Sequence, residues 1–194
     1  RDCLLSRGLG DVYKRQVDPA AVIQSIDVPS IYEVPLKMHQ QHLDEIVLTK
    51  TGLPINGEPH LEPWLNFLHR MKNATKTVRI GLVGKYVELP DAYKSINESL
   101  FQAATYNDRK LDLQYIHSEK LNSGNVDAML SSLDGVLIAP GFGQRGIEGK
   151  FIALKYAREH DIPTFGVCLG MQCMVIEYAR ECWDIPMLTL PKWT

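Results

Sequence analysis

Between residues 78 and 181, short apolar runs alternate with helical patterns, and this alternation constrains the fold more than any other feature. Four runs rich in aliphatic residues predict strands, and each is followed by apolar residues at helical spacing. Strands that alternate with helices form a parallel sheet with helices on both faces. We therefore expect an α/β fold that binds ligands beyond the carboxyl ends of its strands. The predicted strands are 78–84, 111–116, 135–139 and 163–167, and the predicted helices are 92–105, 126–133, 147–160 and 169–180.

The residues before 78 are organised differently. Two prolines in the segment 28–36 predict extended backbone, and a short helix is expected after it. Residues 49–77 are dense in Gly and Pro and contain a short amphipathic segment at 64–71, which indicates a linker. Residues 17–48 are too few to enclose a core, so we interpret them as the end of a domain whose body lies upstream.

The two ends of the chain, residues 1–16 and 182–194, resemble translated adapter sequence. We expect both to be non-native. The first has no apolar core that would make it a secretory signal.

Composition excludes several classes of protein. Lys and Arg total 21 against 23 Asp and Glu, a net charge of −2 that creates no basic field for nucleic acid. No apolar run approaches the roughly 18 residues that cross a bilayer. The four Cys form no C-x-x-C pair, which favours a reducing compartment over a disulfide scaffold or zinc site. We expect a cytoplasmic protein with no nucleic-acid partner, membrane segment or metal ligand.

The most informative motif is Gly166-Val-Cys-Leu-Gly170, placed where a predicted strand turns into a helix. A nucleophile on such a tight turn needs small residues two positions before and after it. Cys168 would also lie at the positive end of the helix dipole, which favours a thiolate. The alternative is a buried structural cysteine, since Cys is among the most buried residue types. The strand-turn-helix context favours the nucleophile.

A second loop, 139–146, follows the preceding strand and is rich in glycine. Its backbone N–H groups can approach a ligand closely, as an oxyanion hole requires, although such a loop alone is a weak signal. We predict that the N–H groups of Gly141 and Leu169 form this hole.

A catalytic thiol normally needs a histidine base. His60 and His117 occur in H-x-E strings, but the first lies in the linker and the second in a short solvated element, so we expect the base to lie beyond this chain. Lys85 and Lys94 are predicted near the functional edge of the sheet. The residues alone favour solvated lysines there, because the spacing is not that of a phosphate loop.

Longer strings resemble a known family. Residues 167–172, VCLGMQ, are similar to the nucleophile motif of class I glutamine amidotransferases. The strings SIYEVP at 30–35, VGKYVELPDAYKS at 83–95 and PGFGQRGIEG at 140–149 resemble the CTP synthase family in particular. The likeness covers about residues 17–181.

The resemblance implies a flavodoxin-like parallel sheet, truncated at its C-terminus, in a cytoplasmic ligase of pyrimidine biosynthesis. A synthase (amidoligase) domain, ending within 17–48, would use ATP and Mg²⁺ to activate UTP. The amidotransferase domain, beginning within 78–181, would supply ammonia from glutamine. GTP is implied as allosteric effector and a homotetramer as the assembly. By position, the resemblance implies that Cys168 is the nucleophile and that Val28 lies near the adenine of ATP. It implies a role in interdomain coupling for Lys85 and Lys94. The residues implied to contact glutamine and the oxyanion are Gly141, Leu169, Gly170, Met171 and Gln172.

This chain lacks several residues that the resemblance implies. The family's catalytic His and Glu form an H-x-E downstream of the nucleophile, and an acid and an arginine there also hold glutamine, but none of these occurs here. The upstream phosphate-binding loop and magnesium ligands of the synthase domain are also missing, so we expect an internal fragment that is inactive alone. One alternative is another class I amidotransferase, for purine or aromatic amino acid synthesis, although it should lack the string 90–95. The other is an inert flavodoxin-like fragment.

Overall fold

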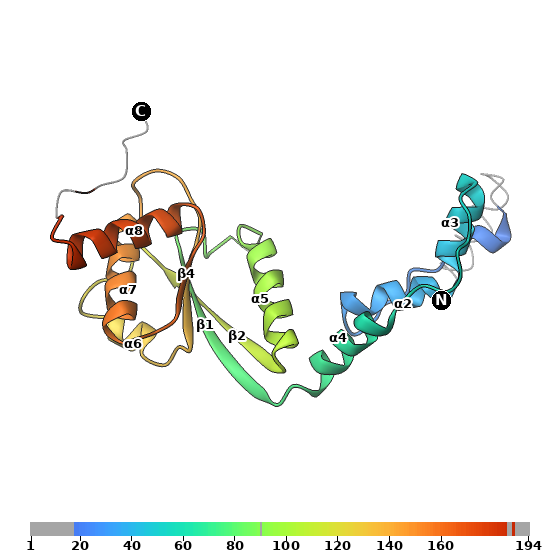
Figure 1. Cartoon of the computed structure of the whole chain (residues 1–194), viewed down its shortest axis with the longest axis horizontal. Coiled ribbons are helices and arrows are strands. Elements are labelled where there is room, and N and C mark those ends of the chain that lie inside the picture. Colours follow the sequence, from blue (N-terminus) through green and yellow to red (C-terminus); the bar gives the residue numbers. More distant parts are fainter. Residues whose placement is uncertain (1–17, 90, 186–187, 189–194) are drawn as a thin grey trace. The chain divides into compact units, whose positions relative to one another are not determined.

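The computed structural model describes residues 18–89, 91–185 and 188, and it divides into two compact units between Leu68 and His69 (Figure 1). The division falls inside the segment 49–77 that the sequence predicts as a linker. The assignment of the predicted ranges to enzyme domains stays a prediction. The proposed non-native stretch 1–16 lies outside the described residues, as does most of 182–194.

The first unit consists of short helices. They are η1 (Pro19–Ala21), η2 (Ile31–Glu33), α2 (Val34–His39), α3 (Leu43–Thr51) and the first part of α4 (Glu62–Asn73). The rings of Tyr32, Trp64 and Phe67 pack together, and Trp64 Nε1 donates a hydrogen bond to the Tyr32 carbonyl at 2.9 Å. This aromatic cluster stabilises the unit.

The prediction of extended backbone over 28–36 is wrong. Residues 31–36 are helical, because the Ser30 hydroxyl accepts a hydrogen bond from the Tyr32 N–H at 3.3 Å and begins η2. Pro35 lies in the first turn of α2, where a missing N–H and a fixed φ are tolerated. The proline that suggested an extended segment therefore begins a helix.

The second unit contains a sheet of four parallel strands in the order β2-β1-β3-β4, which confirms the predicted α/β fold. This is the order at the start of a flavodoxin-like sheet. The elements are β1 (Lys76–Gly84), α5 (Lys94–Tyr106), β2 (Arg109–His117), α6 (Val126–Leu130), β3 (Gly135–Ile138), α7 (Ile147–Glu159), β4 (Thr164–Gly166) and α8 (Leu169–Cys182).

Alternate residues of the central strands face opposite layers, as the pleat requires. Helix α5 covers one face of the sheet, and α6, α7 and α8 cover the other (Figure 1). Leu82 and Leu137 belong to the buried cluster on the α5 side, whereas Val83, Val136 and Ile138 belong to the cluster with α6, α7 and α8. All five side chains are buried. Since β3 and β4 are adjacent and parallel, the loops that follow them leave the sheet side by side.

Candidate active site

Cys168 occupies the sharp turn between β4 and α8 that the sequence predicts. It is the N-cap residue of α8, it is exposed, and its φ of 52° and ψ of −111° lie outside the regions that side-chain-bearing residues favour. Backbone strain of this kind clusters at functional sites. The turn therefore presents the Cys168 thiol at the carboxyl edge of the sheet.

The glycines on either side of Cys168 are sterically required. A Cβ on Gly166 would lie 2.5 Å from the backbone N of Met171, and one on Gly170 would lie 2.1 Å from the carbonyl oxygen of Ile138. Both distances are far shorter than any contact a real Cβ makes. The spacing of the G-x-C-x-G motif thus reflects two close backbone approaches.

The glycine-rich loop after β3 lies beside this turn. A Cβ on Gly141 would be 3.6 Å from Leu169 Cδ2, so the two proposed oxyanion donors belong to neighbouring residues. Among the described residues, neither the Gly141 N–H nor the Leu169 N–H donates a hydrogen bond. Neither N–H group is therefore committed to a hydrogen bond within the described residues.

The other residues implied to hold glutamine lie at the start of α8. Gly170 is buried against β3, while Met171 and Gln172 are exposed. Val28, implied to lie near ATP, is half-buried in an irregular segment between η1 and η2 of the first unit. The roles of all these residues stay predictions.

The two lysines differ in their surroundings. Lys94 is exposed at the first position of α5. Lys85 is only 6% exposed, and its Nζ donates a hydrogen bond to the carbonyl of Phe142 in the glycine-rich loop. The expectation of a solvated side chain thus holds for Lys94 and is wrong for Lys85.

Neither candidate histidine lies beside Cys168 within its unit. His117 ends β2, and the sheet order places two strands between β2 and β4. At a spacing of about 4.8 Å per strand, the ends of β2 and β4 are roughly 14 Å apart. The Nδ1 of His117 instead accepts a hydrogen bond from the Glu119 N–H at 3.3 Å. His60 belongs to the first unit, and 96% of its side chain is exposed.

Sequence reasoning missed one buried group beside the site. Lys150 is fully buried near the start of α7, and its Nζ donates a hydrogen bond of 2.6 Å to the Ala139 carbonyl. Its position carried a signal, because Lys150 is three residues after Ile147 and four before Leu154, on the apolar face of the helix.

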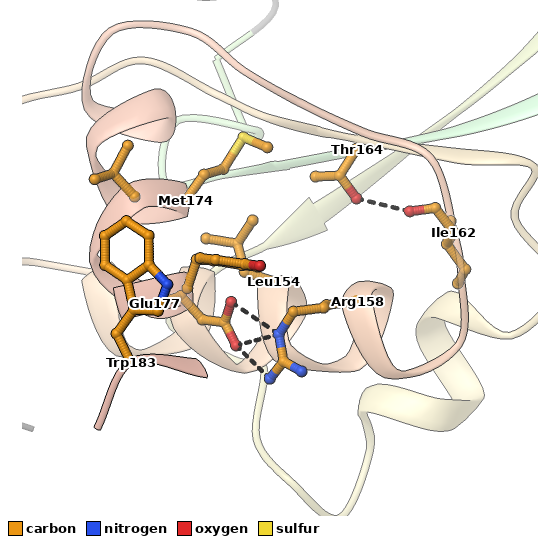
Figure 2. A pocket seen from close by; sticks show the side chains of 9 residues that line it. Leu154, Arg158, Ile162, Thr164, Met174, Glu177 and Trp183 are labelled. Atoms are coloured by element: carbon orange, nitrogen blue, oxygen red, sulfur yellow. Dashed lines mark hydrogen bonds and ion pairs between the residues drawn. The ribbon is translucent and has the colours of Figure 1, made fainter. Parts of the chain in front are cut away.

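A cavity of about 490 Å³ lies elsewhere in this unit, between β4, α7 and α8 (Figure 2). Its walls are mainly apolar, apart from Glu177 and Arg158, whose guanidinium binds the carboxylate of Glu177 at 2.8–3.3 Å. Cys168 is not among its lining residues.

Among the described residues, no helix is long and apolar enough to cross a membrane. The same residues contain no group of three or more His, Cys, Asp or Glu that could hold a metal ion.

Comparison with known families decides the affiliation of the second unit. The family model described as glutamine amidotransferase class-I matches residues 88–189, more than half of the chain. The chain belongs to the class I glutamine amidotransferase family. The glycine-rich loop and the Cys168 turn both lie inside the matched part of this amidotransferase.

Curated relatives of this amidotransferase are named CTP synthase. The protein of Bacteroides fragilis (strain ATCC 25285) is 65% identical over 161 residues, which are 83% of this chain and 30% of that protein. The protein of Porphyromonas gingivalis (strain W83) is 62% identical over 165 residues, which are 85% of this chain and 31% of that protein. The chain thus spans about 30% of the length of these relatives.

A solved structure resembles the amidotransferase as well. It is titled as the glutaminase domain of Trypanosoma brucei CTPS with bound acivicin, and it matches with a TM-score of 0.50 and 41% sequence identity. The match covers 55% of this chain and 42% of that chain. The likeness supports the same fold.

Proposed function

We propose that this chain is part of a CTP synthase, in which the Cys168 thiol hydrolyses glutamine and the released ammonia aminates activated UTP. The observation that carries the proposal is the exposed, strained Cys168 at the turn into α8, beside two unbonded backbone N–H groups. The 65% identity to a protein named CTP synthase supports this choice among class I amidotransferases.

The proposed chemistry begins at the thiol. A base removes the thiol proton, and the sulfur attacks the carboxamide carbon of glutamine. The oxygen becomes an oxyanion, which the N–H groups of Gly141 and Leu169 stabilise by hydrogen bonds. The tetrahedral intermediate collapses as the nitrogen takes up a proton and leaves as ammonia, giving a thioester on Cys168. Water then attacks the thioester, releases glutamate and returns the thiol.

The synthase half of the reaction lies outside this site. We propose that ATP and Mg²⁺ bind a synthase domain that ends in the first unit, with Val28 near the adenine, and that UTP is activated there. In this proposal Mg²⁺ is held outside the described residues, which contain no group of three or more His, Cys, Asp or Glu that could bind it. We also propose that GTP is an allosteric effector and that Lys85 and Lys94 couple the two domains. The full protein would be a cytoplasmic tetramer.

The test uses a chimera in which this sequence replaces the matching 161-residue region of the Bacteroides fragilis relative. We expect Cys168→Ala to abolish CTP formation from glutamine and to leave CTP formation from free ammonia intact. Cys173→Ala is the matched control, because that thiol is buried in the core, and both activities should persist. Equal loss with both nitrogen sources would contradict the proposal, and failure of the parent chimera to turn over UTP would favour another amidotransferase.

A further inference from the structure

Two buried lysines donate hydrogen bonds to backbone carbonyls of the glycine-rich loop. The Lys150 ammonium, on α7, donates to the Ala139 carbonyl at 2.6 Å, and the Lys85 ammonium, just after β1, donates to the Phe142 carbonyl. These carbonyls lie on either side of Gly141. The Lys85 side chain also touches the loop, since a Cβ on Gly141 would be 3.4 Å from Lys85 Cε.

Lys150 is the more unusual of the two. It is fully buried, and among the described residues no carboxylate pairs with it. An ammonium without a counter-ion is expensive to bury, whereas an apolar side chain of the same length would fill the space without that penalty. A role in packing alone does not account for a charge at this position.

The charged groups around Lys150 come from the active-site edge. Burial lowers the pKa of Lys150 most, and the nearby Lys85 ammonium lowers it further. A negative charge on Cys173 or Cys168 would act in the opposite direction and raise the pKa of Lys150. The Lys150 ammonium is therefore close enough to the proposed nucleophile to interact with it electrostatically.

We propose that Lys150 is a positioning residue of the amidotransferase site. Its ammonium fixes the Ala139 carbonyl, so that with Lys85 it sets the direction of the Gly141 N–H, and its positive charge stabilises the Cys168 thiolate. This inference rests on the proposed function, because it assigns Cys168 and Gly141 their roles. Lys150 itself touches neither glutamine nor the reacting atoms in this scheme.

The first test measures thiol reactivity, which needs no glutaminase activity. The 194-residue chain is treated with iodoacetamide from pH 6 to pH 10, and modification of Cys168 is followed by mass spectrometry of its peptide. We expect Lys150→Met to slow the reaction about 3- to 10-fold at neutral pH, since loss of a nearby cation disfavours the thiolate. The difference in alkylation rate between Lys150→Met and the unchanged protein should become smaller above about pH 9, where an ordinary thiol ionises without a nearby cation.

The matched control is Lys155→Met. Lys155 lies on the same helix, but it is solvent-exposed and pairs with Glu181 at 2.8 Å. Its removal should leave the alkylation profile of Cys168 unchanged. A folded Lys150→Met protein with the same profile as Lys155→Met would overturn the proposal.

Two further variants cover the remaining outcomes. Lys150→Gln keeps a hydrogen-bond donor without the charge, and it is assayed in place of Lys150→Met if that protein does not fold. Unfolding of both variants would assign Lys150 a purely structural role and overturn the proposal. In the chimera, Lys150→Met should lower kcat with glutamine by the same factor, leave KM nearly unchanged and spare the ammonia-dependent reaction. If Cys168→Ala kept the glutamine reaction, the proposed function would fail instead.

Discussion

Replacement of Gly170 by Ala tests whether the thiol turn depends on direct contact between α8 and β3. The new Cβ would lie 2.1 Å from the Ile138 carbonyl oxygen, and ordinary contact begins at 3.4 Å, so the helix and the strand must separate by at least 1.3 Å. That carbonyl cannot turn away freely, because it accepts a hydrogen bond from the Val167 N–H at 3.1 Å.

The expected loss of stability follows from competing effects. Ala is favoured over Gly inside a helix by about 1 kcal/mol. Overpacking costs about 1–3 kcal/mol, and weakening the Val167 hydrogen bond costs about 1 kcal/mol more. The clash therefore outweighs the helix preference, and we expect a net destabilisation of about 1–3 kcal/mol, or roughly 4–12 °C in the melting temperature of this unit.

The assay is thermal unfolding followed by circular dichroism, together with iodoacetamide alkylation of Cys168. Gly141→Ala is the matched control, because its new Cβ would meet the Lys85 and Leu169 side chains only at 3.4 and 3.6 Å. We expect that variant to change stability by less than about 1 kcal/mol. A Gly170→Ala protein as stable as Gly141→Ala, with unchanged alkylation of Cys168, would refute the steric reasoning.

Two other predictions concern buried charge. Arg158→Ala should lower the free energy of unfolding by about 3 kcal/mol in urea titration, because it leaves the buried Glu177 carboxylate without its partner. Lys155→Ala, which breaks an exposed ion pair, should lower the free energy of unfolding much less. Equal losses of stability in the two variants would contradict this prediction. Burial lowers the pKa of Lys150 below its ordinary 10.5, so the unfolded chain binds more protons in that window and stability rises with pH. The free energy of unfolding of wild type minus that of Lys150→Met should therefore grow from neutral pH toward 10.5, and a flat or falling difference would contradict the burial argument.

The amidotransferase fold could be predicted from the sequence because β3 and the last four residues of β1 are buried on both faces of the sheet. Such strands appear as uninterrupted apolar runs, and the predicted run 135–139 differs from β3, Gly135–Ile138, by one residue. The helix predicted over 126–133 ends at Leu130 instead, because the chain then turns and the Asp134 carboxylate accepts a hydrogen bond from the Arg79 N–H at 2.8 Å. That contact joins distant parts of the chain and has no local signal.

The candidate site was predictable only in part, for related reasons. The turn around Cys168 could be inferred because its two glycines are spaced by the geometry of a single turn. The directions of Lys85 and Lys150 depend on partners 57 and 11 residues away, Phe142 and Ala139. Lysine is usually a surface residue, so the residue type alone predicted an exposed side chain for Lys85, which is buried.

The close approach of Gly170 to Ile138 has a consequence for how this site can be inherited or transplanted. The Gly141 loop, Lys150 and Cys168 all fall between β3 and the start of α8, in one continuous strand-helix-strand unit. The backbone of Gly170, at the end of that unit, lies directly against the backbone of Ile138, near its start. This contact keeps the thiol and the glycine-rich loop at a fixed spacing. Exchange of residues 135–170 as a whole, into a protein that keeps a lysine at the position of Lys85, should preserve the geometry of the site. Exchange of either loop alone would have to recreate the fit between the two loops.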